Sequence, residues 1–267
     1  MNRSRRKVIS SKLRKTKILS RSAALIRYVP QTDVLTSGRL SQMLHRYGMV
    51  YIKPVTGSLG IGVMRIDNIG GSYRYQSGLR TYTFDTFRQM YASIRRRIDA
   101  KRYLVQRGID MLRHKERPFD FRVMVQRNPS GSWECTGTAA RLAHPNKVVT
   151  NGSQGGTIYP AGALLEEAAG KQIAGLLTEE MKKIAVFAAY QFSRFYPAMN
   201  ELGLDIAVDG CLRPWILEVN TRPDPCPFTK LPDPAVIGKI KKYARAYGRV
   251  YNLACMKARK APSLPSD

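Results

Sequence analysis

Apolar residues recur at helical spacing in four parts of the chain, and each pattern predicts a helix with one buried face. The first helix is expected over residues 37–47 and the second over residues 85–98. A third, from residue 178 to about 195, should begin with an N-cap threonine that is followed by two acids. The fourth should run from residue 234 to about residue 256. Much of the remaining sequence is β-rich, so helices and strands both contribute to the expected fold.

Two apolar runs over residues 205–220 begin or end in side chains that carry oxygen ligands. If the runs form adjacent antiparallel strands, Asp205, Glu218 and Asn220 approach one another, because residues two apart on a strand share a face. Two carboxylates and an amide oxygen suit Mg²⁺, which leaves its other positions to water and phosphate oxygens. Asp209 is a second choice of ligand if the strand is regular. The alternative is a β-hairpin whose polar residues face solvent.

A glycine loop follows a β-rich run near residue 50 and leads into a second β-rich run. Glycines let backbone N–H groups approach phosphate oxygens closely, and hydroxyl side chains add further donors. The loop is not a Walker A motif, because its lysine precedes the glycines and a strand follows where that motif needs a helix. The alternative is an ordinary glycine-rich turn with the lysine facing water. The candidate phosphate-binding residues are Lys53, Thr56, Gly57, Ser58, Gly60 and Gly62.

Together, the glycine loop and the paired oxygen ligands resemble the corresponding parts of the ATP-grasp superfamily. Residues 103–109 resemble its hinge, which passes the adenine edge. Three further motifs follow in the order seen in the YheC/YheD-type, endospore coat-associated group of ATP-grasp proteins. This resemblance implies an α+β fold of two α+β subdomains, with the nucleotide held between antiparallel sheets. The three motifs are Pro118–Gln126, Thr138–Arg141 and Asn151–Gly156.

The resemblance also implies that ATP and Mg²⁺ are the cofactors. Asp205, Glu218 and Asn220 would hold the metal, and the glycine-loop residues would bind phosphates. Many members carry a second nucleotide lysine upstream of the glycine loop, whereas residues 31–44 contain none. Phosphate affinity is then reduced, or Arg39 compensates. The hinge residues expected to bind the nucleotide are Gln106, Arg107 and Ile109.

Two arginines resemble the inward basic residues of the family. Arg122 and Arg141 would be the catalytic residues that bind the reacting carboxylate or the transferring phosphoryl group. The alternative is a structural ion pair with Asp120 or another acid. That alternative is less favoured for Arg141, because Ala139 and Ala140 leave it without a nearby acid.

Charge sets the N-terminal segment apart. The chain has 45 Lys and Arg residues against 19 Asp and Glu, and its first 32 residues contain no acid. We expect residues 1–29 to form a basic, mobile segment that docks on a polyanionic surface such as a coat, a cell-wall polymer or nucleic acid. A solvated tail without a specific partner is the alternative. The ATP-grasp domain should span residues 30–256, divided into subdomains at 48–105 and 106–256, and residues 257–267 form a tail.

The resemblance favours an ATP-dependent ligase that joins a carboxylate to an amine, or to a thiol, through an acylphosphate. The alternative is a nucleotide-binding structural or assembly protein of a spore-coat type with little or no catalysis. Binding of nucleic acid through charge alone lacks a recognised motif. No apolar run approaches the ~20 residues that cross a bilayer, and no signal-peptide core is present. A cytoplasmic, possibly spore-associated protein is therefore expected, with ATP and unknown carboxylate and amine substrates as its ligands.

Overall fold

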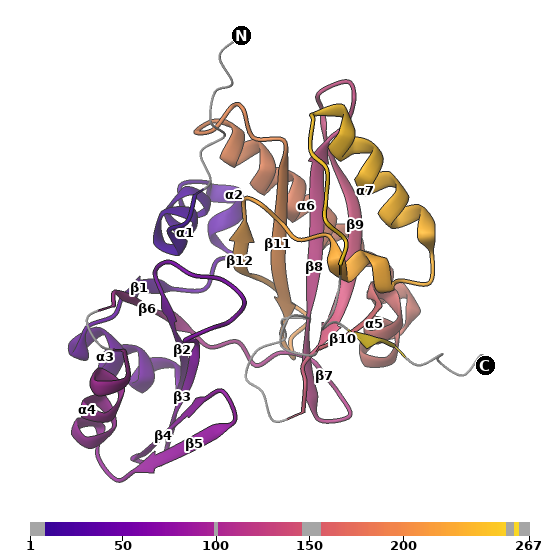
Figure 1. The fold of residues 1–267 in the computed structure, drawn as a ribbon. Helices are drawn as coiled ribbons and strands as arrows, with labels where there is room; N and C mark the ends of the chain where they lie inside the picture. Colours follow the sequence, from indigo (N-terminus) through magenta and orange to yellow (C-terminus); the bar gives the residue numbers. More distant parts are fainter. Residues whose placement is uncertain (1–8, 99–100, 146–155, 255–258, 262–267) are drawn as a thin grey trace.

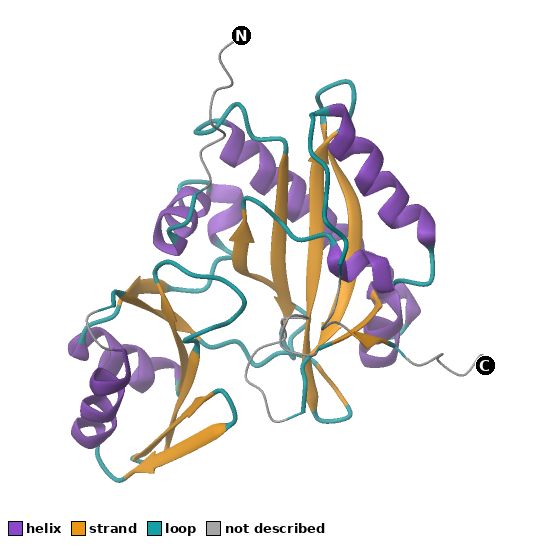
Figure 2. Ribbon diagram, viewed as in Figure 1, coloured by secondary structure: helices purple, strands orange, loops and turns teal. Residues whose placement is uncertain are grey.

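Two β-sheets, each with its own helices, form two subdomains of the chain (Figure 1). The structure is a computed structural model that describes residues 9–98, 101–145, 156–254 and 259–261. Helices and strands are mixed in both parts, and most neighbouring strands are antiparallel (Figure 2). The expected α+β architecture is confirmed.

The smaller subdomain is a six-stranded sheet in the order β1-β6-β2-β3-β4-β5, with two helices on one face. Val50 and Ile52 are fully buried beneath those helices. Because side chains alternate along a strand, Lys53 lies on the opposite face, which is open towards the larger subdomain. The elements are β1 (Thr32–Val34), α3 (Ser37–Tyr47), β2 (Met49–Pro54), β3 (Met64–Ile69), β4 (Ser72–Ser77), β5 (Arg80–Phe84), α4 (Phe87–Ile98) and β6 (Tyr103–Arg107).

The larger subdomain is a seven-stranded sheet in the order β12-β11-β8-β9-β10-β13, with β7 paired to β8. The long helix α6 covers one face of this sheet, and α7 packs on the other. The strands are β7 (Arg113–His114), β8 (Arg117–Arg127), β9 (Trp133–Leu142), β10 (Thr157–Pro160), β11 (Glu201–Val208), β12 (Pro214–Asn220) and β13 (Arg259–Lys260). The helices are α5 (Ala161–Ala169), α6 (Lys171–Ser193), the 3-10 helix η2 (Cys226–Lys230) and α7 (Pro234–Ala246).

The N-terminal segment differs from the expected mobile tail. Within it, α1 (Lys12–Ser20) and α2 (Ala23–Ile26) are helical, and Leu19 and Leu25 are buried in the core of the larger subdomain. The buried Gln191 amide of α6 donates a hydrogen bond to the carbonyl oxygen of Ile18 at 3.0 Å. The described part of this segment is therefore integrated into the ATP-grasp body, whereas residues 1–8 lie outside the described residues.

Two of the four predicted helices are confirmed, and two have different ends. Helices α3 and α4 agree with the apolar spacing, but α6 begins at Lys171 instead of residue 178. The apolar face continues upstream through the buried Leu177, so Thr178 lies inside the helix and its hydroxyl donates to the carbonyl of Ala174. Helix α7 ends at Ala246, because Gly248 adopts a φ of 74° and turns the chain.

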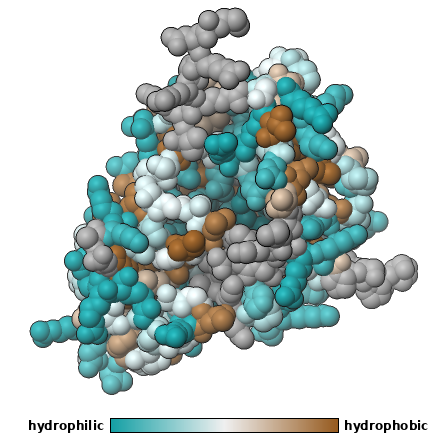
Figure 3. All heavy atoms as spheres, viewed as in Figure 1, coloured by the Kyte–Doolittle hydropathy of each residue, from teal (hydrophilic) through white to brown (hydrophobic). Residues whose placement is uncertain are grey.

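The surface matches the basic, polar composition. On the face shown in Figure 3, exposed apolar residues form small, separate groups among hydrophilic ones. Within the described residues, no helix is both long enough and apolar enough to cross a membrane. The C-terminal tail expected from residue 257 is described only at residues 259–261.

Candidate functional site

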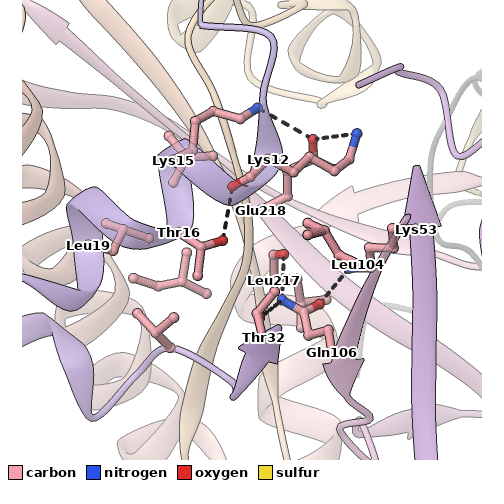
Figure 4. A pocket seen from close by; sticks show the side chains of 13 residues that line it. Lys12, Lys15, Thr16, Leu19, Thr32, Lys53, Leu104, Gln106, Leu217 and Glu218 are labelled. Atoms are coloured by element: carbon pink, nitrogen blue, oxygen red, sulfur yellow. Dashed lines mark hydrogen bonds and ion pairs between the residues drawn. The ribbon is translucent and has the colours of Figure 1, made fainter. Parts of the chain in front are cut away.

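A pocket lies where α1, the smaller sheet and strand β12 meet (Figure 4). It contains about 410 Å³ of space, including space open to solvent. Leu104 and Leu217 give it an apolar wall, and Lys53, Gln106 and Glu218 give it polar groups. Residues from the predicted phosphate, hinge and metal sites thus line one pocket.

Helix α1 adds two lysines that the sequence analysis did not assign to the site. The ammonium groups of Lys12 and Lys15 lie 3.4 and 3.6 Å from the same oxygen, Oε1 of Glu218 (Figure 4). Lys12 also donates from Nζ to the carbonyl oxygen of Gly57 at 2.7 Å, which ties α1 to the glycine loop. Both lysines are buried, so they face the pocket and do not belong to an exposed polyanion-binding surface.

These lysines change the expectation that a second nucleotide lysine is missing. Residues 31–44, directly upstream of the glycine loop, contain no lysine, whereas Lys12 reaches the loop from further upstream. The available signal was helical spacing, because Lys12, Lys15 and Leu19 recur at three- and four-residue intervals behind the N-cap Ser11. The absence of acids in this segment instead favoured the prediction of a basic, mobile segment.

Lys53 projects from β2 towards the neighbouring strand β6. Its ammonium group donates a hydrogen bond of 2.6 Å to Oε1 of Gln106, and the Gln106 amide donates to the Thr32 hydroxyl at 3.1 Å. Lys53 is half-buried, and desolvation of its ammonium group lowers its pKa, while the nearby Glu218 carboxylate opposes the shift. Burial likewise lowers the pKa of Lys15, against the same carboxylate.

The glycine loop connects β2 to β3 and extends towards the larger subdomain (Figure 1). Gly57, Gly60 and Gly62 have φ values of 127°, 72° and 75°, which other residues rarely adopt. Thr56 and Ser58 are exposed on the same loop. The glycines therefore give the loop a backbone conformation that other residues disfavour, and the two hydroxyl groups remain accessible.

Only one of the three predicted hinge side chains lines the pocket. Gln106 does so, whereas Ile109 is buried beside Trp215. The Arg107 guanidinium lies 5.0 Å from the ring centroid of Tyr47 and 4.7 Å from that of Trp215, which belong to different subdomains. Its backbone N–H donates to the Gln31 carbonyl at 2.8 Å. The Arg107 side chain therefore joins the subdomains by cation–π contacts.

The predicted catalytic arginines both contact Asp205. Arg122 donates from Nε to Asp205 Oδ1 at 2.7 Å, and a terminal nitrogen of Arg141 lies 3.2 Å from Oδ2. Arg141 also binds Asp120 through two hydrogen bonds of 2.8 and 2.5 Å. The expectation that Arg141 lacks a nearby acid is wrong, because Asp120 lies directly opposite it in the pairing of β8 with β9.

This network controls the charge of Asp205. Burial alone would raise the pKa of Asp205, but the guanidinium groups of Arg122 and Arg141 outweigh it and lower the pKa. Burial alone would lower the pKa of Arg141, and Asp120 and Asp205 instead raise it. All four residues are at most 8% exposed. Asp205 therefore remains ionised between two guanidinium groups at neutral pH.

The three predicted metal ligands share one face of the sheet, because Asp205 pairs with Glu218 and Gly203 pairs with Asn220. Glu218 and Asn220 are partly exposed and supply oxygen atoms of the kind Mg²⁺ prefers. Both oxygens of Asp205 contact arginines. Among the described residues, no group of three or more His, Cys, Asp or Glu side chains could hold a metal ion. Two of the three expected ligands therefore present accessible oxygen atoms, and a Mg²⁺ ion held by Glu218 and Asn220 would keep most of its water.

Asp209, the second choice of ligand, has a structural role. Its Oδ1 accepts hydrogen bonds from the backbone N–H groups of Cys211 and Arg213, both at 3.0 Å. Its Oδ2 accepts one from the indole N–H of Trp215 at 2.7 Å. The carboxylate therefore closes the turn between β11 and β12, and its expected place as an alternative ligand is wrong.

Comparison with known proteins places these features in one family. A family model described as YheC/D like ATP-grasp matches residues 5–250. The chain is 25% identical over 206 residues to the endospore coat-associated protein YheD of Bacillus subtilis (strain 168), which covers 73% of this chain and 44% of that protein. It is 26% identical over 201 residues to the endospore coat-associated protein YheC of the same organism, covering 73% of this chain and 55% of that protein. The chain thus spans about half the length of these curated relatives.

A solved structure supports the fold. The match is to N5-carboxyaminoimidazole synthase from Aspergillus clavatus, in complex with ADP and 5-aminoimidazole ribonucleotide. It covers 95% of this chain and 55% of that chain. The TM-score is 0.53 and the sequence identity is 8%, so the likeness concerns the fold alone. The family and the fold predicted from the sequence are confirmed.

Proposed function

Because the chain belongs to the YheC/D-like ATP-grasp family, we propose that it is an ATP- and Mg²⁺-dependent ligase that activates a carboxylate as an acylphosphate. An amine, or a thiol, would then attack the acyl carbon and form the product. The observation that supports this best is the convergence of Lys12, Lys53 and Glu218 on one pocket between the two sheets. A triphosphate needs positive charge arranged in advance, and this pocket provides it.

The nucleotide would bind with its phosphates against the two lysines and the glycine loop. Lys53 approaches from β2 and Lys12 from α1, while the loop residues Thr56 and Ser58 offer hydroxyl groups. The apolar wall at Leu104 and Leu217 suits a flat base, and Gln106 lies beside it. The base would be recognised along the hinge by backbone groups of the strand and the residues that follow it.

Glu218 and Asn220 would hold a magnesium ion. Asp205 would become the third ligand if Arg122 or Arg141 released one of its carboxylate oxygens. When bound, the ion supplies positive charge to the phosphate oxygens. Glu218 contacts two lysines at more than 3 Å and is partly exposed, so a cation can approach it. Lys12 and Lys15 meanwhile neutralise this carboxylate.

Arg122 and Arg141 would act on the reacting groups in different ways. A carboxylate oxygen of the substrate attacks the γ-phosphorus, the bond to the β–γ bridging oxygen breaks, and ADP leaves. Arg122 lies at the edge of the network and would bind the carboxylate or the transferred phosphoryl group. Arg141 is 2% exposed and holds Asp120 and Asp205, so it would keep that edge positioned. Phosphate leaves when the amine attacks the acyl carbon.

A second candidate function follows from the names of the relatives. YheD and YheC are endospore coat-associated proteins, and a chain of this family can bind nucleotide as part of a spore-coat structure or its assembly. This candidate predicts magnesium-dependent nucleotide binding without turnover. The ligase predicts ADP formation that requires both a carboxylate and an amine or thiol.

Titration calorimetry with a slowly hydrolysed ATP analogue tests the site. We expect the wild type to bind the analogue more tightly with Mg²⁺ than without it. In a Glu218→Gln, Asn220→Ala variant, this dependence on Mg²⁺ should disappear, because the metal-binding oxygens are altered or lost. Glu166→Gln, at an exposed carboxylate on α5, is the matched control and should bind as the wild type does.

Turnover then separates the two candidates. ADP release is measured with mixtures of carboxylic acids and amines, and the Glu218→Gln, Asn220→Ala variant provides the background. Acceptor-dependent ADP release supports the ligase, while binding without release across the mixtures favours the structural candidate. If the wild type does not bind the analogue at millimolar concentration, both candidate functions are contradicted.

A further inference from the structure

Helix α6 carries large apolar side chains on the face that points away from the sheet. Ile173, Leu176, Phe187 and Tyr190 are 40%, 67%, 55% and 51% exposed. The opposite face of the same helix is buried in the core of the larger subdomain. Single exposed apolar residues are common, but four of them along one helix form a surface that a partner could cover.

These residues follow a regular spacing. Together with Glu180 and Lys183 they lie at intervals of three, four, three, four and three residues, which is the seam pattern of paired helices. We call these six residues the α6 stripe. Its two ends are apolar and its centre has one acid followed by one base. Lys183 is exposed, and Glu180 is partly exposed and accepts a hydrogen bond from the Tyr28 hydroxyl at 2.9 Å.

We propose that the α6 stripe binds the same stripe of a second copy of this chain, with the two helices antiparallel. A two-fold axis midway between Glu180 and Lys183 places Glu180 opposite Lys183 of the partner subunit, and the reverse. The same axis places Leu176 opposite Phe187 of the partner subunit and Ile173 opposite Tyr190 of the partner subunit. Apolar ends therefore meet apolar ends, and opposite charges meet at the centre.

Charge complementarity selects this partner and this orientation. A parallel pairing in register would place Glu180 against Glu180 and Lys183 against Lys183, which is unfavourable. The stripe also needs no complementary surface on another protein, because it is complementary to itself. Aromatic side chains such as Phe187 and Tyr190 are enriched in the centres of interfaces.

The arrangement leaves the candidate site open. The side chains of Phe121 and Leu204 face α6, whereas Arg122 and Asp205 lie on the other face of the same strands. In Figure 1, α6 lies behind the larger sheet. The dimer would therefore form without covering the pocket, and nucleotide binding should not depend on it.

The net charge predicts how association responds to salt. Each chain carries a formal charge of +26, so two chains repel one another at low ionic strength. Salt screens charges beyond about 10 Å at 0.1 M, whereas the apolar contacts of the stripe persist. We expect the dimer to strengthen as salt increases. A single helix pair is small for an interface, which places the dissociation constant at roughly micromolar values.

Sedimentation equilibrium of the full chain, over a range of concentration and salt, tests the proposal. Glu180→Lys and Lys183→Glu should each weaken the wild-type dimer at least about tenfold, because like charges then meet at the centre. An equimolar mixture of the two variants should form a heterodimer, and the doubly exchanged variant should dimerise again. Lys182→Glu is the matched control, since it reverses a charge one residue away and off the stripe, and it should leave the dimer unchanged.

Several results would overturn the proposal. The first is a wild type that stays monomeric up to about 100 μM at 0.5 M salt, which is far above the micromolar dissociation constant expected. The second is that Glu180→Lys and Lys183→Glu leave the dimer unchanged. The third is that the doubly exchanged variant does not dimerise. Because Glu180 contacts Tyr28, circular dichroism must first show that Glu180→Lys folds. If it does not fold, Leu176→Ser replaces it. Leu176→Ser should be monomeric where the wild type is dimeric, and an unchanged dimer would refute the stripe as the interface.

Discussion

Replacing Arg141 with methionine should destabilise the protein by about 3–5 kcal/mol, the cost of removing one partner from a buried ion pair. Arg141 is 2% exposed and neutralises Asp120 and part of Asp205. Methionine fills a similar volume, so the loss reports charge more than packing. The buried Asp120 carboxylate would lose its guanidinium partner, and Asp205 would keep only Arg122. Urea denaturation followed by circular dichroism measures the change as a lower midpoint at constant slope.

A second substitution separates the buried network from a general effect of losing an arginine. Arg113→Met removes an exposed arginine, 3.7 Å from Asp110, and should change the stability by less than about 1 kcal/mol. Asp120→Asn combined with Arg141→Met should lose less than the sum of the two single changes, because the neutral amide no longer needs the guanidinium. A loss below 1 kcal/mol for Arg141→Met alone would show that the carboxylates find another partner or take up protons.

The sequence predicted the family, the fold and the shared face of Asp205, Glu218 and Asn220, because these depend on local order and strand alternation. Asp205 and Glu218 lie opposite one another in neighbouring strands that are joined by a short turn. Such a pairing can be predicted from the motif and from two-residue periodicity. The order of the glycine loop, hinge and arginine motifs identified the family, and helices α3 and α4 followed from their apolar spacing.

The partners of the arginines could not be predicted in the same way. Arg141 follows two alanines, so its neighbours in the sequence show no acid, while Asp120 is 21 positions away in the sequence and directly opposite in the sheet. Cross-strand register decides such contacts, and a single residue of slip would change them. The bulge between Met124 and Val125 shows that the spacing along β8 is itself irregular.

The role of α1 was also hidden, for a different reason. A segment with many lysines and no acids has the composition of a solvated tail. Composition does not show that Lys12 and Lys15 find their counter-charge in Glu218, more than 200 residues later. Burial of Ile18 and Leu19 against α6 and the large sheet stabilises the helix that holds the lysines in place. Two lysines of this basic segment, Lys12 and Lys15, therefore line the candidate site.

Replacing Lys12 with methionine should weaken binding of the Mg²⁺–nucleotide complex by about 10- to 100-fold. That range corresponds to about 1.5–3 kcal/mol, the usual contribution of a hydrogen bond to a charged group. Lys12 lies at the junction of the glycine loop and Glu218, where the triphosphate is proposed to bind. Titration calorimetry with the slowly hydrolysed analogue measures the affinity, and thermal unfolding without nucleotide measures the stability of the same variant.

Lys17 provides the control because it is exposed on the same helix and its ammonium group does not line the pocket. Lys17→Met removes the same charge from α1 and should bind the nucleotide as the wild type does. Lys15 still neutralises Glu218 in Lys12→Met, so the unfolding temperature should change little while the affinity falls. Equal affinities for Lys12→Met and Lys17→Met would mean that α1 covers the pocket without contributing charge, and Lys53 would then be the main phosphate-binding cation. A fall in both affinity and stability would instead mean that Lys12 acts by holding the glycine loop against α1.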